Sequence, residues 1–401
     1  MSDVERPAAE TTASPPLRLI VILAVCTGIG PFAMQIFLPA LPSIQAHYAV
    51  SPVTAQLAFS LSGIAMAVAT LFYGPVADRY GRRPTILAGL VLYLLGSALC
   101  TIAPTITWLI FGRIVQAAGG VAGMVLSRAI IRDLFDREQA ASAISYVTMA
   151  MVVAPMIAPA LGGILIDTFE WRSVFVVAGL VGIIVLVAVW IELGETGRPA
   201  RGAGGLAGMF GGFRVLATDA QFLAYATQGA FSMSVFFTFL AAAPYVMVTV
   251  LGMPPTRYGL MFVLVSGSFM TGNFISARFG RRLGVDRMIL VGSVGTVVGT
   301  SLSLLLLVAL PWSPWSLFAP MMITALAQGA AMPSGQAAVV SVRPDMAGSA
   351  SGLAGFGQMT VASTMAQIVG SIQTGTPYPV ALGMLASALG MLAAAVIACR
   401  R

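Results

Sequence analysis

The chain has 401 residues, of which 58% are hydrophobic and only 9% are charged, whereas an average soluble chain is about 45 to 50% apolar and about 25% charged. This composition excludes a soluble globular protein. All 21 basic residues are arginines, which excludes a P-loop ATPase and a Schiff-base enzyme, because both need a lysine amine. The net charge of +7 does not indicate nucleic-acid binding, because the arginines are too few and too dispersed to follow a phosphate backbone.

Twelve apolar segments are long enough to cross a membrane. A hydrocarbon core about 30 Å thick takes about 20 helical residues, because each residue rises about 1.5 Å. The sequence therefore predicts an all-α integral membrane protein with twelve transmembrane helices. The predicted spans are 18–40, 54–76, 84–103, 106–130, 141–166, 172–193, 221–243, 257–278, 288–310, 316–340, 348–370 and 379–399.

The connections divide the chain into two halves. We expect residues 1–16, which are rich in Ala, Thr and Pro, to form a disordered cytoplasmic head. Residues 17–193 are the predicted N-terminal six-helix half, and residues 221–401 are the C-terminal one. The segment 194–220 contains many glycines, which predicts a flexible cytoplasmic linker between the halves.

The arginines favour one side of the membrane. If the N-terminus is inside, eighteen of the 21 arginines fall in the head, the linker, the tail or the loops on the cytoplasmic side. Arg172 and Arg257 fall on the other side, and Arg113 alone lies deep inside a span. Because basic residues concentrate in cytoplasmic loops, we expect the N- and C-termini to be cytoplasmic. We also expect a multi-pass protein of the cell membrane, specifically a bacterial inner membrane.

Few residues in the chain are suited to enzyme or metal chemistry. Cys26, Cys100 and Cys399 lie in apolar stretches, and His47, the single histidine, falls in a loop. An odd number of cysteines without ligand spacing argues against disulfides and a metal site. One loop histidine without an acid in the middle of a span cannot supply acid–base chemistry. We therefore expect no enzyme activity, no metal and no cofactor.

A short basic motif recurs at matching positions of the two halves. The sequence RYGRR at 79–83, after the second span, returns as RFGRR at 278–282, after the eighth. Cytoplasmic loops are basic in any case, but the shared register favours duplication. A parallel repeat about an axis along the membrane normal is a transporter architecture. A channel would instead need rings of carbonyls or charges from repeated subunits.

The segment GPVADRYGRR at 74–83 resembles the loop signature of the major facilitator superfamily. RIVQ at 113–116 resembles a second motif of that family, and APALGG at 158–163 resembles its antiporter motif, with Ala158 in place of the usual Gly. Three further segments resemble the bicyclomycin/chloramphenicol (Bcr/CflA) drug-efflux branch: LPALP at 38–42, IRDLF at 131–135 and AGSAS at 347–351. The resemblance implies the major facilitator fold of two pseudo-symmetric six-helix halves and a drug:proton antiporter.

The resemblance assigns a gating role to the loop after the second span, through Gly74, Asp78, Arg79, Gly81, Arg82 and Arg83. Gly81 permits a tight turn, and two arginines anchor the loop at an anionic leaflet. The family pattern implies that Asp78 faces the positively polarised N-terminus of span eleven in the outward-facing state. The alternative is that Asp78 pairs within its own loop, with Arg79 or Arg132. Arg132 and Asp133 belong to the same expected cytoplasmic charge network.

The fifth span is interrupted by residues that weaken a helix. Pro155 and Pro159 each remove a backbone hydrogen bond, and Gly162 and Gly163 follow. Small residues four apart let another helix approach closely. We expect this span to lie at the interface between the halves and to act as a gating hinge.

Five residues are candidates for the substrate cavity or for coupling: Gln35, Arg113, Gln116, Phe231 and Gln328. A charged guanidinium within a span is costly and marks a water-filled pathway or a functional pair by default, although Arg113 can also reach a membrane surface by snorkelling. Gln116 lies on the same helical face, where it can share hydrogen bonds with Arg113. Gln35 stands where related efflux proteins carry an acid.

These observations together predict a secondary active transporter that exports small amphipathic or drug-like molecules of phenicol or bicyclomycin type in exchange for protons. Its expected partners are the small-molecule substrate, protons and the lipid bilayer, with no nucleic acid, and it acts as a monomer. Because Gln35 replaces the usual acid, an exporter or uniporter of a small metabolite without proton antiport stays an alternative. Fold alone does not decide the substrate.

Overall fold

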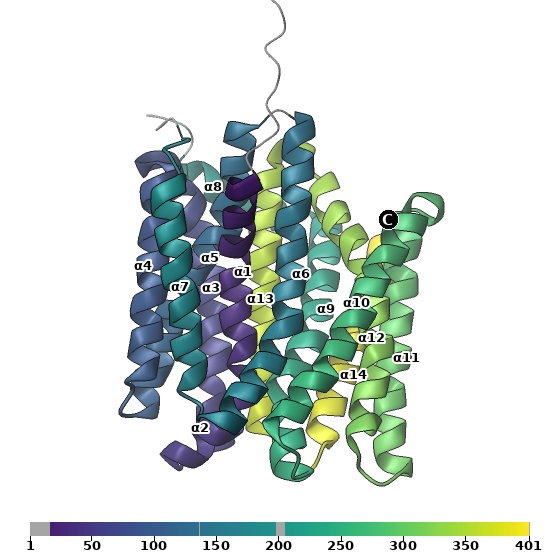
Figure 1. Cartoon of the computed structure of the whole chain (residues 1–401). Coiled ribbons are helices and arrows are strands. Elements are labelled where there is room, and N and C mark those ends of the chain that lie inside the picture. The colour runs from purple at the N-terminus through teal and green to yellow at the C-terminus, as the bar shows by residue number, and fades with distance from the viewer. Residues whose placement is uncertain (1–16, 136, 198–204, 401) are drawn as a thin grey trace, which may run out of the picture.

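The computed structural model describes residues 17–135, 137–197 and 205–400. The predicted head and the middle of the linker lie outside these residues. The long helices run alongside one another in a single bundle (Figure 1). The helices are α1 Leu17–Ile36, α2 Leu41–Tyr48, α3 Pro52–Tyr80, α4 Arg82–Thr101, α5 Ile106–Leu134, α6 Arg137–Thr168, α7 Ser173–Glu192, α8 Gly205–Leu216, α9 Ala220–Tyr245, α10 Pro255–Leu283, α11 Val285–Ala309, α12 Pro314–Ser341, α13 Ala347–Ser371 and α14 Tyr378–Cys399, with short turns at Leu38–Ala40, Val246–Val250 and Pro344–Met346.

Each of the twelve predicted spans corresponds to one long helix in the described part of the chain. Eleven of these helices are apolar enough over 18 residues to cross a membrane. The twelfth, α13, is 25 residues long but rich in Gly, Ser, Thr and Gln, and it packs between α3 and α9 inside the bundle. Its polar composition suits a helix that is covered mainly by protein rather than by lipid.

The first span differs from its prediction. The sequence predicts one helix over 18–40, but α1 ends at Ile36 and a short turn at Leu38–Ala40 leads into α2. Pro39 and Pro42 explain the break, because proline donates no backbone hydrogen bond and its ring clashes with the preceding turn. The helix α2 therefore lies at one end of the bundle (Figure 1).

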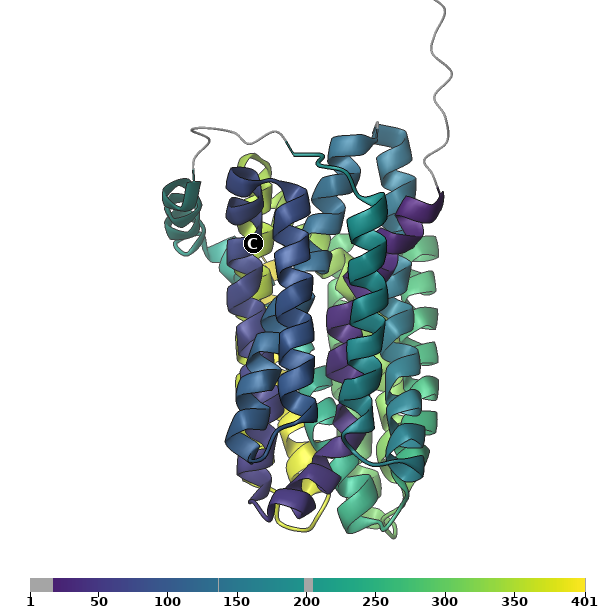
Figure 2. The same ribbon diagram turned by 60° about the vertical axis from the view of Figure 1, so that its left-hand side comes forward.

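The linker between the halves is partly helical. The sequence predicts a flexible segment over 194–220, but α8 forms within it. Figure 2 shows α8, in dark teal at the upper left, beside the bundle rather than inside it. Leu216, the last residue of α8, is fully buried, and a Cβ on Gly212 would lie 2.9 Å from the Ser349 hydroxyl at the start of α13. Packing against the C-terminal half accounts for the helix despite its glycines.

The two halves repeat the same helix packing. In the N-terminal half, α1 packs on α6, and both α3 and α4 pack on α5. In the C-terminal half, α9 packs on α13, and both α10 and α11 pack on α12. These pairs occupy matching positions in the order of the two halves, which is the internal repeat that the RYGRR and RFGRR motifs predict.

The halves meet mainly through two helix pairs, α3 with α13 and α6 with α10. We call the end of the bundle that carries α8 the linker end, and the opposite end the α2 end (Figure 1). A Cβ on Gly163 of α6 would lie 2.6 Å from the Pro255 carbonyl oxygen, and a Cβ on Gly259 of α10 would meet the backbone of α6. A Cβ on Gly74 or Gly348, near the linker end, would meet no atom within 4 Å. The halves therefore touch backbone to backbone at the α2 end, whereas a side chain at either of these two positions of the linker end would have open space.

Candidate functional site

The gating motif forms the sharp turn between α3 and α4. Gly81 has φ +101°, a backbone conformation that residues with a Cβ rarely adopt. A Cβ there would also lie 2.5 Å from a Glu195 carboxylate oxygen. The positive φ favours glycine, so the turn occurs directly after Tyr80 and α4 begins at Arg82. Gly81 thus lies in a tight turn, and its role in gating stays a prediction.

Asp78 pairs within its own loop in this conformation. Its side chain is 58% exposed and lies 2.6 Å from Arg82 Nη1. Arg82 also donates from Nε to Asp133 at 3.1 Å, which links the start of α4 to the end of α5. Arg79 instead lies over the Tyr80 ring at 5.3 Å. The sequence offered pairing of Asp78 within its own loop as an alternative. Asp78 does form such an ion pair, but with Arg82 rather than with the expected Arg79 or Arg132.

The predicted contact between Asp78 and the start of α13 is not made here. Gly348, at that helix start, has open space where a Cβ would lie, and the Asp78 carboxylate is occupied by Arg82. The contact was predicted for an outward-facing state, so it stays a prediction about the opposite conformation. Arg132 is exposed beside Asp133 at the same end.

Glu195 contacts this loop, which sequence reasoning did not predict. Its carboxylate accepts hydrogen bonds from the backbone N–H of Arg82 at 2.9 Å and of Arg83 at 3.3 Å. The first N–H groups of a helix lack intrahelical partners and carry partial positive charge, so a carboxylate stabilises them. Arg83 in turn donates to the Trp190 carbonyl at 2.8 Å. The start of the linker is thereby fastened to the gating motif; only the fold brings these segments together.

Arg113 lies inside the N-terminal half. Arg113 is only 1% exposed, which excludes snorkelling of its side chain to a membrane surface. Nη1 donates to the Ala33 carbonyl of α1 at 3.2 Å and to Gln116 Oε1 at 2.5 Å. Gln116 donates to Ser97 of α4 at 2.8 Å, and the guanidinium carbon lies 4.3 Å from the centre of the Phe37 ring. The predicted pairing of Arg113 with Gln116 is confirmed, and the group joins α1, α4 and α5.

The other cavity candidates lie in different surroundings. Gln35 is 5% exposed, and its Oε1 has no hydrogen-bond partner among the described residues. Gln328 is 4% exposed and donates to the Ser232 carbonyl of α9 at 2.9 Å. The Phe231 ring lies against Gly390 of α14, within its own half. Gln35 Oε1 and Arg113 Nε are thus the buried candidate atoms without a hydrogen-bond partner among the described residues, and Phe231 contributes to packing.

The interrupted fifth span lies at the interface, as predicted. The helix α6 continues through Pro155 and Pro159 to Thr168. Gly162 faces the Ile36 carbonyl of α1, and Gly163 faces the start of α10. The two glycines therefore let α6 contact its own half on one side and the opposite half on the other.

Polar contacts between the halves cluster at the α2 end, and the sequence reasoning did not identify them. Asp167 of α6 accepts from the Thr256 backbone N–H at 3.0 Å and from the Thr256 hydroxyl. On the other helix pair, Ser60 donates to Gln367 at 2.5 Å, and Gln367 donates to the Val53 carbonyl at 3.1 Å. These contacts join residues of opposite halves.

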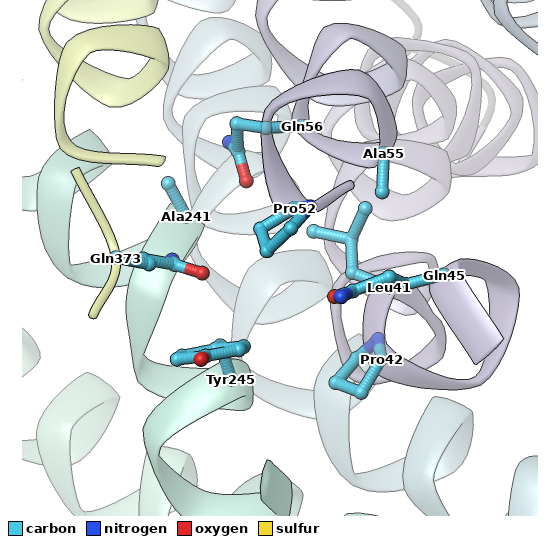
Figure 3. A pocket seen from close by; sticks show the side chains of 9 residues that line it. All are labelled: Leu41, Pro42, Gln45, Pro52, Ala55, Gln56, Ala241, Tyr245 and Gln373. Atoms are coloured by element: carbon cyan, nitrogen blue, oxygen red, sulfur yellow. The ribbon is translucent and has the colours of Figure 1, made fainter. Parts of the chain in front are cut away.

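A narrow hollow at the α2 end shows how closely the halves fit there. Its volume is about 10 Å³, which is the room of about one water molecule. Figure 3 shows Tyr245 and Gln373 of the C-terminal half on one side and Leu41, Pro42 and Gln45 of the N-terminal half on the other. Such a hollow does not admit a drug-sized molecule, so the bundle is closed at this position.

Two repeated six-helix halves that meet closely at one end define the architecture of a secondary transporter, in which the substrate site lies between the repeats. The model of the Major Facilitator Superfamily matches residues 23–367. The chain belongs to this superfamily.

Known proteins resemble the chain over most of its length. It is 27% identical over 367 residues to a bicyclomycin resistance protein homolog of Haemophilus influenzae, covering 91% of this chain and 92% of the relative. It is 31% identical over 244 residues to the multidrug resistance protein MdtL of Escherichia coli, covering 61% and 62%. These relatives agree with the Bcr/CflA motifs. A partially occluded inward-open structure of the xylose transporter XylE from E. coli has a TM-score of 0.74 at 12% identity, covering 96% and 97%, which shows the shared fold.

Proposed function

We propose that the protein exports small amphipathic or drug-like molecules of phenicol or bicyclomycin type across a bacterial cytoplasmic membrane by alternating access. The observation that carries this proposal is the close contact between the halves at Gly163 and Gly259 of the α2 end, whereas a Cβ on Gly74 or Gly348 of the linker end would have open space. A carrier must close one end before it opens the other. The names of the bicyclomycin- and multidrug-resistance relatives support the substrate class.

We assign the linker end to the cytoplasm. Arg82 and Arg83 begin α4 and Arg278 and Arg282 lie near the end of α10, all at this end of the bundle, whereas Arg172 belongs to the α2 end. Basic loops face the cytoplasm. With this orientation the structure corresponds to an inward-facing conformation, both chain termini are cytoplasmic, and the gating motif lies on the inner side.

Proton exchange is the proposed driving force, and uncoupled transport is the second candidate. Every carboxylate in the described part of the chain lies in a loop or in the first or last turn of a helix. Gln35, buried with an unpaired oxygen, occupies the position expected for a proton-binding acid. This observation favours a facilitator or uniporter of a neutral molecule, because a carboxamide binds no proton near neutral pH.

Export is tested by expression in a drug-sensitive bacterium that lacks its own efflux systems. We expect reduced accumulation of phenicols or bicyclomycin and increased resistance relative to an empty vector. Unchanged sensitivity across a broad compound panel, with the protein present in the membrane, would overturn drug export and favour a metabolite.

Coupling is tested in proteoliposomes that contain a pH-sensitive dye. Antiport predicts that adding the exported compound on one side moves protons in the opposite direction. Saturable flux of the compound without a change of internal pH would refute antiport and support the uniporter.

A further inference from the structure

The start of α10 is capped by the opposite half of the molecule. The helix begins at Pro255 after Pro254, whose side chain offers no hydrogen-bond acceptor. The first N–H groups of a helix have no intrahelical partner. Asp167, in the last turn of α6, supplies the acceptor through Oδ2, at 3.0 Å from the Thr256 nitrogen and within hydrogen-bonding distance of the Thr256 hydroxyl. The helices α3, α5, α9 and α12 take such an acceptor from the side chain of their own N-cap residue, whereas for α10 it is supplied across the interface.

The backbones around this contact are close enough to fix its position. A Cβ on Gly163, one turn before Asp167, would lie 2.7 Å from the Thr256 Cα. Gly259, one turn after Thr256, has the backbone of α6 in the corresponding place. The carboxylate therefore meets the helix start only while α6 and α10 are in contact, and separation of the halves at this end removes its partners.

A second acid three residues away provides a comparison. Glu170 is 58% exposed and lies 3.7 Å from Arg172 of its own half. Among the carboxylates whose side chains the structure describes, Asp167 is the one that hydrogen-bonds to the opposite half. A negative charge at the α2 end is therefore not sufficient for contact with the opposite half, because Glu170 carries one and pairs within its own half.

We propose that Asp167 is a positioning residue of the transport cycle, whose carboxylate holds the α2 end closed by capping α10 across the interface. The proposal rests on the proposed alternating-access function. When the α2 end opens, the Asp167 carboxylate and the first N–H groups of α10 lose their mutual hydrogen bonds and bind water instead. Loss of the carboxylate shifts the equilibrium toward the conformation that is open at the α2 end.

The shift is measured with a cysteine reporter on each side of the membrane in the full-length chain, with Cys399 replaced by Ser. Cys26 and Cys100 are buried. Gln56→Cys is the α2-end reporter, because Gln56 is 4% exposed and lies against Gly370 of the opposite half. Gly348→Cys is the linker-end reporter, since its Cβ has open space. A membrane-impermeant maleimide labels each reporter from its own side.

Asp167→Ala is expected to increase the labelling rate at position 56 about five-fold, the effect of losing one capping acceptor, and to decrease labelling at position 348. Asp167→Asn, which keeps an acceptor oxygen, gives a smaller shift, and Thr256→Val, which keeps the N–H, gives an intermediate one. Glu170→Gln is the matched control and leaves both rates unchanged.

Unchanged labelling in Asp167→Ala, in protein that elutes as a single species, would overturn the proposal. If that variant does not fold, unchanged labelling in both Asp167→Asn and Thr256→Val overturns it instead. Labelling requires no substrate, so a shift without export of any compound refutes the proposed export and not the role of Asp167.

Discussion

Two acids of the N-terminal half, Asp78 and Asp167, occupy equivalent positions at opposite ends of the bundle. Each lies in the last turn of its helix, α3 or α6, and that helix packs against a C-terminal-half helix, α13 or α10, which begins at the same end. Asp167 caps its neighbour, whereas Asp78 pairs with Arg82 of its own loop. The position of these acids on their helices therefore does not decide which partner they take.

The largest expected effect is at the linker end. Asp78→Asn is predicted to abolish export, because the neutral side chain loses its charge interaction with the start of α13 in the opposite conformation. Drug accumulation in cells measures export, and immunoblotting of the membrane fraction confirms insertion. Normal export by this variant would show that the two ends do not work by equivalent contacts.

The contact between the halves at the α2 end is disrupted most directly by adding side-chain volume there. Gly259→Val is predicted to lower export about ten-fold or more, because its side chain clashes with the backbone of α6 and prevents closure. Gly267→Val, on the same helix, is the control, since its Cβ has open space. Equal export rates for the two variants would contradict the importance of backbone contact at this end.

The comparison of the two ends assumes that each half is internally stable. The buried contacts of Arg113 inside the N-terminal half allow us to test this assumption. Arg113→Ala is predicted to lower the free energy of unfolding by about 3 kcal/mol, because buried acceptors lose their donor and a cavity forms. Arg172→Ala removes a guanidinium at the same 4.3 Å from an aromatic ring but 28% exposed, so we expect about 0.5 kcal/mol. Thermal unfolding in detergent distinguishes them, and similar losses would mean that burial is unimportant.

The smallest effect concerns Asp219, which caps α9 within one half. The backbone N–H of Phe222 lowers the pKa of Asp219, with contributions from Arg343 and Gln221. A lowered pKa means that the ionised acid stabilises the fold above its unfolded pKa of about 3.9, and that this contribution disappears as the pH falls through the lowered value. Asp219→Asn is therefore expected to flatten the decrease of Tm below about pH 4. An unchanged pH profile would contradict this.

The fold was largely predictable because apolar length is a local property. Eleven of the twelve helices contain an 18-residue window apolar enough for the membrane, and the repeat is visible in 79–83 and 278–282. The break after Ile36 was missed, although Pro39 and Pro42 signal it. The helix α8 was missed because its glycines have low helix propensity, which contacts with the C-terminal half override.

The site was predictable only where partners lie on the same helix. Gln116 was found for Arg113 because three residues separate them, whereas Ala33 and Phe37 lie on other segments. Asp167 and Thr256 are 89 residues apart, and no local pattern relates an acid at one helix end to the start of another helix. Contacts between the halves depend on conformation as well as sequence.

The position of Arg113 also has a mechanical consequence. Its guanidinium holds a carbonyl of α1 and, through Gln116 and Ser97, connects to α4. If α1 slid past α5, the charged Arg113 guanidinium would lose its hydrogen-bond partners in an environment that cannot solvate it. These contacts resist sliding of α1 past α5, so we expect the proposed alternating-access motion to occur as rocking about the contacts of α3 with α13 and of α6 with α10. Arg113 can in this way influence turnover without touching the cargo.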